Sequence, residues 1–279
     1  MSTFQYEQSM PSTSRTDWFS RKSSRSGTFL KVIRTVKNWP TYGADYLELL
    51  NREHITLTLR DGTKFRMRPG TSDRKIFNEV WIHRAYTPAG FEIGEADYVV
   101  DIGAHIGAFS ILASKYAKRG MVYAFEPVPQ NFEMLKQNAC INKVTNIVPH
   151  DAAISDRSGE RQLYLLSKRN TGWNSFYTLG AGYQTAIAVR TLSLEKVVEE
   201  RGIPRIDLLK MDCEGAEYDI LFACPARVLK FIRRISLEYH DVGEGRNVIS
   251  LERFLSRKGF EVEVRSDDFK ILYARNLSI

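Results

Sequence analysis

The segment that most constrains the fold is residues 100–110, where a run of buried-type residues enters a glycine turn and then a helix. Its sequence is Val-Asp-Ile-Gly-Ala-His-Ile-Gly-Ala-Phe-Ser, with glycines at positions 103 and 107. Gly103 lets the backbone turn tightly, and Gly107 lets a ligand approach the start of the helix. A strand, a glycine turn and a helix in this order predict an α/β fold with a parallel sheet.

Strands and helices alternate through the rest of the chain after residue 97, apart from an irregular stretch at 160–194. Asp267 and Asp268 separate the last two strands, which predicts an antiparallel hairpin. Together these strands make a mainly parallel, seven-stranded, Rossmann-like sheet, the strand plan of class I methyltransferases. The strands are expected at 98–103, 121–126, 146–150, 206–211, 232–238, 260–265 and 269–274, and the helices at 107–118, 129–140, 193–201, from about 215 and at 247–258.

The chain divides into three parts. Residues 1–40 are expected to be a basic, flexible leader with a short amphipathic helix, which Pro40 closes. Residues 41–96 are expected to form a cap with a β-hairpin around Asp61-Gly62 and a helix at 73–86. Residues 97–279 are expected to be the α/β domain that carries the glycine turn and its ligand site.

Charge is unevenly distributed along the chain. The net charge is +7, and residues 1–38 carry seven basic and two acidic side chains, or +5, which leaves +2 for the rest. Such a leader suits nucleic acid, an acidic lipid surface or an anionic substrate, although a solvated tail is the simpler interpretation. Because the core carries little net charge, we expect no nucleic-acid partner, whereas peripheral membrane contact through residues 1–38 stays open.

The protein is expected to be cytoplasmic. No run of residues approaches the ~18 apolar positions that a membrane span requires, and the N-terminus has no apolar region typical of a secretory signal. The three cysteines show no CxxC spacing, which predicts reduced thiols rather than disulfides or a structural zinc site.

The glycine turn favours a nucleoside without a pyrophosphate. A dinucleotide fingerprint requires glycine at position 105, which is His105, and no phosphate-binding loop motif occurs. S-adenosylmethionine carries no phosphate. Asp101 can bind its ammonium, directly or through water, and backbone amides of the turn can bind its carboxylate. His105 is expected to pack beside the methionine tail.

Two further acids follow the next strands. Glu126 ends the second strand and can accept hydrogen bonds from both ribose hydroxyls. Asp151 follows the third strand and can accept the adenine amino group, or it can cap a turn or helix instead. Three acids at consecutive strand ends make the cofactor-site interpretation stronger than any one of them alone.

On these residues the chain resembles the FkbM-type methyltransferase family over roughly residues 54–240. The resemblance rests on the glycine turn, on Ala-Phe-Glu-Pro-Val-Pro at 124–129 and on Ile-Asp-Leu-Leu-Lys-Met-Asp-Cys-Glu-Gly-Ala-Glu at 206–217. Glu-Tyr-His at 238–240 closes it. The resemblance implies S-adenosylmethionine as cofactor, so residues 97–279 are expected to be an S-adenosylmethionine-binding methyltransferase domain. It also implies that the methyl acceptor is usually a hydroxyl, on a small molecule, sugar or glycolipid.

The catalytic candidates follow the fourth and fifth strands of the core: Asp212, Glu214, Glu238 and His240. A carboxylate or histidine can take the proton of an acceptor hydroxyl, and we favour His240 as base with Asp212 placing the substrate. Alternatively, Asp212, Glu238 and His240 can hold a divalent metal. Glu214 and Glu217 can also simply stabilise the start of a helix.

The loop at 170–176, in the irregular stretch, is a candidate wall for the acceptor. Its Trp and Phe side chains can stack on sugars or rings, although an ordinary surface loop explains it equally well.

Two other functions remain open. The basic leader suits an RNA or protein methyltransferase, although the core has no amine-methylation motif of the Asn-Pro-Pro-Tyr type. A non-catalytic module that binds S-adenosylmethionine is the other, against which the acids at the strand ends argue.

Overall fold

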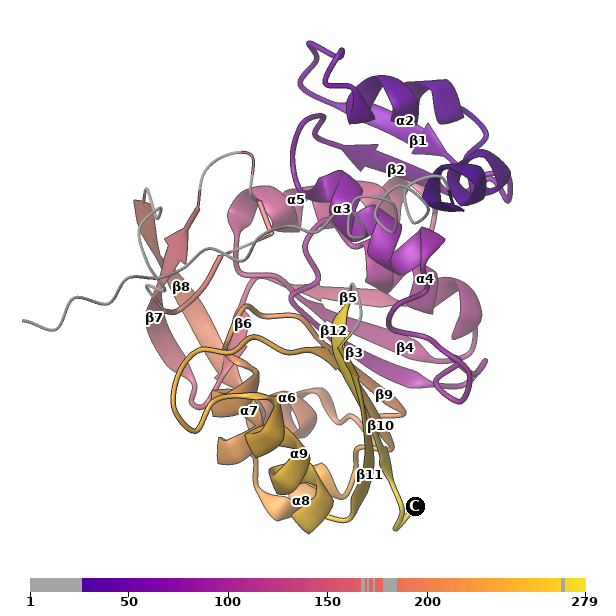
Figure 1. Cartoon of the computed structure of the whole chain (residues 1–279). Helices are drawn as coiled ribbons and strands as arrows, with labels where there is room; N and C mark the ends of the chain where they lie inside the picture. The colour runs from indigo at the N-terminus through magenta and orange to yellow at the C-terminus, as the bar shows by residue number, and fades with distance from the viewer. Residues whose placement is uncertain (1–26, 167–168, 170, 173, 178–184, 267–268) are drawn as a thin grey trace, which may run out of the picture.

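The computed structural model describes residues 27–166, 169, 171–172, 174–177, 185–266 and 269–279. Its centre is a seven-stranded sheet with the strand order β11-β12-β10-β9-β3-β4-β5 (Figure 1). Five strands are parallel, and β12 pairs antiparallel with both β10 and β11. This arrangement confirms the predicted class I methyltransferase sheet and its C-terminal hairpin. The strands are β3 (Tyr98–Ile102), β4 (Met121–Phe125), β5 (Ile147–His150), β9 (Leu208–Met211), β10 (Arg234–Glu238), β11 (Phe260–Ser266) and β12 (Lys270–Asn276).

Helices cover both faces of the sheet, because alternate residues of the central strands face opposite sides. Val99 of β3 belongs to the apolar cluster that contains α4, whereas Val100 belongs to the cluster beneath α7, α8 and α9. The helices on the first face are α4 (Ala108–Tyr116) and α5 (Pro129–Ile141), and those on the second are α6 (Leu194–Arg201), α7 (Glu217–Ala223), α8 (Ala226–Leu229) and α9 (Val248–Arg257).

The N-terminal cap begins with a helix over residues 27–35, followed by α2 (Trp39–Tyr46) and the antiparallel hairpin of β1 (Ile55–Thr58) and β2 (Lys64–Met67). Pro40 does not close the first helix as predicted. It lies in the first turn of α2, where a missing N–H costs nothing and the fixed φ of proline suits a helix start. No helix in the described part of the chain has the length and apolarity of a membrane span.

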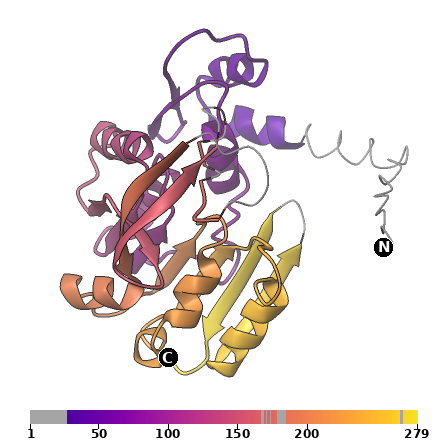
Figure 2. The same ribbon diagram turned by 90° about the vertical axis from the view of Figure 1, so that its left-hand side faces the viewer.

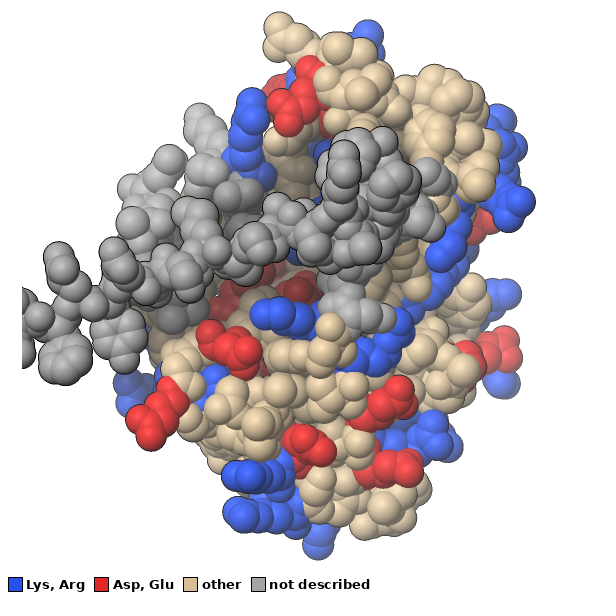
Figure 3. All heavy atoms as spheres, in the orientation of Figure 1, with Lys and Arg blue, Asp and Glu red and all other residues tan. Residues whose placement is uncertain are grey.

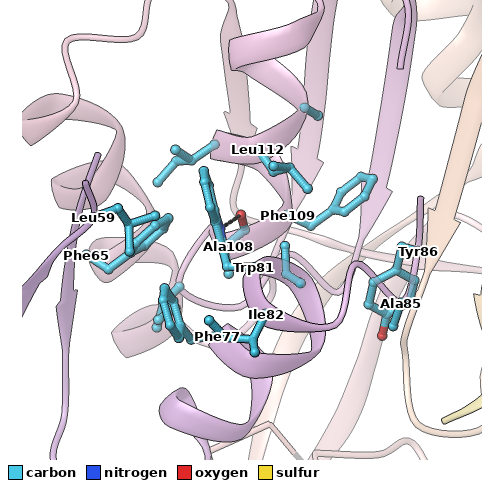
Figure 4. Close-up of a cluster of buried hydrophobic side chains, with 14 of the residues drawn as sticks. Leu59, Phe65, Phe77, Trp81, Ile82, Ala85, Tyr86, Ala108, Phe109 and Leu112 are labelled. Carbon is cyan, nitrogen blue, oxygen red and sulfur yellow. Dashed lines mark hydrogen bonds between the residues drawn. The ribbon is translucent and has the colours of Figure 1, made fainter. Parts of the chain in front are cut away.

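The helix predicted at 73–86 is shorter and changes its winding. It consists of α3 (Asp73–Phe77) followed by one π-helical turn, η1 (Asn78–Ile82). In this turn Trp81 packs edge-on against Phe65 of the hairpin and donates a 3.0 Å hydrogen bond to the carbonyl of Ala108 (Figure 4). The cap and the first layer of helices therefore share one apolar core.

The irregular stretch forms a small second sheet of β6 (Ala153–Ser155), β7 (Gly159–Leu165) and β8 (Thr185–Ser193), in the order β6-β8-β7. The sequence indicated only short β-like pieces at 162–166 and 187–192. The small sheet stands beside the end of the main sheet at which α5 begins (Figures 1 and 2).

Candidate functional site

A cavity lies at the carboxyl ends of β3, β4 and β9. The N-terminal cap, the main sheet and the small sheet all contribute residues to it. The glycine turn after β3 and the acids after β4 and β9 form its polar wall. Ile76 and Val80 of the cap face it from one side, and Ile154 and Leu163 of the small sheet face it from another. Gly103, His105, Glu126, Asp212 and Glu214 therefore line one shared cavity.

The glycine turn is closely packed. Gly103 has a φ of +74°, and a Cβ built on it would lie 1.8 Å from the carbonyl oxygen of Asp212. Gly107 also has a positive φ, of +82°, but a Cβ there would meet Leu135 of α5. The structure thus places Gly107 at the contact between α4 and α5, and not in the cavity wall.

Glu126 is buried at the end of β4 and holds the turn in place. Its two carboxylate oxygens accept hydrogen bonds of 2.8 Å from the backbone N–H groups of His105 and Val128. Burial raises the pKa of Glu126 to about 7, although these two N–H groups oppose the shift. Oε1 also accepts a long hydrogen bond of 3.5 Å from the Asn131 side chain. Each carboxylate oxygen offers about two acceptor sites, so Oε2 keeps one for a hydroxyl in the cavity.

Asp101 does not face the cavity. Its carboxylate is fully buried, accepts a 2.6 Å hydrogen bond from Ser110 and lies 3.2 Å from the ammonium of Lys210. Lys210 also donates a 2.9 Å hydrogen bond to the carbonyl of Gly103 and does line the cavity. The cation of Lys210 therefore already pairs with the carboxylate that the sequence suggested for the cofactor ammonium.

His105 joins the glycine turn to two other segments. Its Nε2 lies 3.1 Å from Thr171 Oγ1 and 3.6 Å from Asp73 of α3. Burial lowers the pKa of His105 to about 4, even though Asp73 opposes the shift, so the ring is neutral at pH 7. Thr171 in turn donates to Asp73 over 3.0 Å. These contacts hold Thr171 in the wall of the cavity.

Asp151 is exposed at the end of β5 and is not among the residues that line the cavity. The chain continues into β6, so that Ala153 and Ile154, together with Val128 and Phe176, form the wall at this end. The structure thus offers a flat ring system an apolar wall at this end of the cavity, and not the carboxylate of Asp151 that the sequence suggested.

Two acids and a tyrosine meet beyond Lys210. The hydroxyl of Tyr86 lies 3.1 Å from Asp212 and 3.3 Å from Glu238, so it bridges the ends of β9 and β10. Burial, together with these two acids, raises the pKa of Tyr86 well above its usual value. The hydroxyl therefore keeps its proton and can donate a hydrogen bond. Asp212 lines the cavity, whereas Glu238 stands behind it.

His240 lies between two carboxylates. Its Nδ1 is 3.2 Å from Glu217 and its Nε2 is 3.2 Å from Glu214. Burial alone would lower the pKa of His240, but Glu217, Glu214 and Asp212 outweigh it and raise the pKa to about 10. Burial raises the pKa of Glu214 to about 8, with His240 opposing and the neighbouring acids adding to the shift. His240 is therefore an imidazolium here and does not line the cavity.

Glu217 organises the turn that carries Glu214. Its buried carboxylate accepts hydrogen bonds from the backbone N–H groups of Cys213 and Gly215, over 3.1 and 3.0 Å. Glu214 itself has a φ of +52°, a conformation that costs energy for a residue with a side chain. Among the described residues, Asp212, Glu214 and His240 also form the one group whose ligand atoms lie within 4.8 Å of one another and could hold a metal ion.

A model of the methyltransferase FkbM domain matches residues 101–262, which is more than half of the chain. The chain belongs to the FkbM methyltransferase family. It is an enzyme that uses S-adenosylmethionine, and its match begins at Asp101, before the glycine turn.

Several known proteins are similar over much of this chain. The 31-O-demethyl-FK506 methyltransferase FkbM of Streptomyces tacrolimicus is 31% identical, covering 69% of this chain and 83% of that protein. The hexuronic acid methyltransferase AglP of Haloferax volcanii is 27% identical over 64% of this chain and 72% of its own length. The AMB antimetabolite synthetase AmbE of Pseudomonas aeruginosa is 29% identical over 69% of this chain, which spans only 11% of that protein. Among solved structures, M. jannaschii TYW2 in complex with AdoMet is 17% identical, with a TM-score of 0.44 over 81% of this chain and 86% of that one.

The cavity of this FkbM-family chain fits the cofactor that the family uses. Glu126 keeps an acceptor site for a ribose hydroxyl, the apolar wall of Val128 and Ile154 suits the adenine, and the absent side chain of Gly103 leaves the turn close to β9. S-adenosylmethionine supplies, when bound, an electrophilic methyl group on a sulfonium.

Sequence reasoning missed two residues of this FkbM-family site. Tyr86 and Asn131 are isolated polar residues in the sequence, and no motif marks them. Asn131 donates to the Thr171 carbonyl over 3.0 Å. Thr171 itself was not missed, because it lies in the segment 170–176 that the sequence suggested as an acceptor wall. Asn170 and Trp173 of that segment lie outside the described residues, whereas Gly172, Asn174 and Phe176 do line the cavity.

Proposed function

We propose that this enzyme transfers a methyl group to a hydroxyl oxygen of a small molecule, a sugar or a glycolipid. The observation that carries the proposal is the single cavity that joins Glu126, at the nucleoside end, to Asp212 and Glu214 at the other. A hydroxyl becomes a good nucleophile only when a base takes its proton, and these acids offer acceptors at the far end of the cavity.

Glu214 is our candidate for the base. It lines the cavity, and a pKa of about 8 matches the proton affinity that suits a base near neutral pH. Asp212, which accepts a hydrogen bond from Tyr86, would orient the acceptor hydroxyl. The sequence favoured His240 as base. Since both of its nitrogens face carboxylates, we instead propose that His240 positions Glu214.

The names of two relatives support this acceptor class. One relative is a 31-O-demethyl-FK506 methyltransferase, and the other is a hexuronic acid methyltransferase. The first name specifies an oxygen, and the second specifies a sugar acid. The alternatives are methylation of RNA or protein, and cofactor binding without catalysis.

The cytoplasmic location stays a prediction.

A divalent cation is the second arrangement that this site supports. Asp212, Glu214 and Nε2 of His240 offer oxygen and nitrogen ligands close together. A cation held there would lower the pKa of an acceptor hydroxyl. The cation would also replace the proton of the His240 imidazolium as the positive charge beside these acids.

The test is to incubate a cell extract with the enzyme and methyl-labelled S-adenosylmethionine, and to identify the labelled product. We expect the label on an oxygen of a small molecule or glycan. The variant Glu214→Gln should lower kcat about 10²- to 10⁴-fold while cofactor affinity stays within about threefold, as expected for a base that binds no cofactor. Glu244→Gln is the matched control, since Glu244 is exposed and does not line the cavity. Label in the RNA or protein fraction, or none at all, would contradict the proposal.

A further inference from the structure

Large apolar side chains are exposed together on the N-terminal cap. Thirteen large hydrophobic residues in the described part of the chain are exposed, and six of them lie within residues 29–49. We call these six the N-terminal apolar patch. They border a groove between the helix over 27–35 and α2, at the top of the molecule, where the surface in Figure 3 is mostly uncharged. The patch consists of Phe29 (40% exposed), Leu30 (57%), Trp39 (37%), Tyr46 (48%), Leu47 (63%) and Leu49 (70%).

The patch is not an accident of poor packing. Val32 and Val36 of the same segment are fully buried, so the first helix anchors one face in the core and exposes the other. Phe29 and Trp39 pack edge to face, with ring centroids 5.9 Å apart. Exposed apolar surface concentrated in this way marks an interaction site.

The charge around the patch is positive. Lys31, Arg34 and Lys37 are exposed on the first helix and the turn after it, and residues 1–38 carry +5 in total. Of the acids near the patch, Asp45 is buried and paired with Arg74, and Glu48 pairs with Arg169. Basic side chains beside Trp, Tyr, Phe and Leu are the combination that amphipathic surfaces use to lie on anionic bilayers.

We propose that the N-terminal apolar patch docks this enzyme on the surface of a bilayer that contains anionic lipids. The leucines and Phe29 would insert among the acyl chains, and Trp39 and Tyr46 would lie at the headgroup level, where amphipathic rings are favoured. Lys31, Arg34 and Lys37 would contact the headgroups. This contact does not depend on which acceptor the enzyme methylates.

The patch lies next to the catalytic cavity. Asn78 borders the groove and hydrogen-bonds to Tyr42 of α2, whereas Ile76 and Val80 of the same segment line the cavity. The α3–η1 segment therefore lines both the groove of the patch and the cavity. If the proposed hydroxyl methylation is correct, this proximity favours the glycolipid among the candidate acceptors.

The test is flotation of the full chain with vesicles of phosphatidylcholine alone, or with about a third of phosphatidylserine, at low and high salt. We expect binding to the anionic vesicles that weakens with salt. Leu30→Glu combined with Leu47→Glu should weaken binding roughly tenfold or more, because both side chains leave the apolar phase. Lys31→Gln combined with Arg34→Gln should weaken it about 25-fold, at about fivefold for each basic residue.

The matched control is Ile249→Glu combined with Leu277→Glu, which changes two equally exposed apolar residues elsewhere. Equal weakening by this pair, no vesicle binding by the full chain, or full binding by the Leu30 and Leu47 variant would each overturn the proposal. So would a dimer that this variant dissociates, since the patch would then bind a second copy. Cofactor affinity of every variant should stay within twofold, so that failure here remains distinct from failure of the proposed methylation.

Discussion

Lys210 and Asp101 face each other across neighbouring parallel strands, with the lysine ammonium 3.2 Å from the carboxylate and both side chains buried. Burial alone would lower the pKa of Lys210, but Asp101 and Asp212 raise it above its usual value, so the lysine stays charged. One buried charge thus compensates the other at the edge where the cofactor is expected.

Lys210→Met should therefore destabilise the protein by about 3–5 kcal/mol, because it leaves the carboxylate of Asp101 buried and unpaired. Adding Asp101→Asn to this variant should recover much of the loss, since no charge then remains without a partner. Urea unfolding measures both values. Lys230→Met, at an exposed lysine, should stay within about 0.5 kcal/mol of the parent. A loss below about 1 kcal/mol for Lys210→Met would show that the pair is not compensating.

Cofactor affinity should depend on pH through Glu126. The pKa of this carboxyl is raised to about 7, so it takes up a proton as the pH falls through 7 and then accepts fewer hydrogen bonds from ribose hydroxyls. Affinity should fall about tenfold for each pH unit well below 7. Calorimetry between pH 5.5 and 8.5 measures the effect.

Glu126→Gln is the control for that profile. It should bind about 10- to 150-fold more weakly at pH 8, equivalent to 1.5–3 kcal/mol for lost charged hydrogen bonds, and its affinity should lack the step near pH 7. A step that persists in this variant would assign the titration to another group.

Gly103→Ala should unfold the turn. The added Cβ would lie 1.8 Å from the carbonyl oxygen of Asp212, and the φ of +74° already disfavours a side chain. We expect a loss of more than about 3 kcal/mol in unfolding free energy and no measurable cofactor binding. Gly62→Ala shares the positive φ, at +87°, but has nothing within 4 Å, so it should cost only about 1 kcal/mol. If both variants lost similar amounts of unfolding free energy, the close contact between position 103 and the Asp212 carbonyl would have no effect on stability.

Chelation should leave activity within about twofold, because His240 is an imidazolium that lies 3.2 Å from both Glu214 and Glu217, and its protonated Nε2 offers no lone pair to a metal ion. The measurement is methyl transfer after extensive treatment with EDTA, with and without added Mg²⁺, Mn²⁺ or Zn²⁺. Activity that disappears on chelation and returns with one of these ions would instead establish the metal arrangement of Asp212, Glu214 and His240.

The strand plan was predictable because it depends on local patterns. Buried-type strands that end in Gly103, Glu126 and Asp212 appear as short apolar runs with a fixed alternation, and parallel connection brings their ends to one edge. The place of these three residues at one edge of the sheet follows from that rule, whereas the order of the strands comes from the structure. The family match confirms the resemblance that the motifs suggested.

What the sequence did not reveal depends on contacts between distant segments. Asp101 and Lys210 are 109 positions apart, and only the register of β3 with β9 pairs them. Asp151 failed to reach the cavity because the chain turns into β6 after β5, and a single sequence does not show where the small sheet starts. The π-helical turn at 78–82 has no periodic signature, since five residues are too few to define one.

The wall built by α3, η1 and Tyr86 has a practical consequence for anyone who moves this enzyme between proteins. Ile76, Val80 and Tyr86 all precede residue 101, where the family match begins. A module excised at the limits of the match would carry the glycine turn and the acids but would leave one side of the cavity open to water. Fusions and chimeras should therefore be cut upstream of the hairpin, so that the transplanted piece brings its own lining.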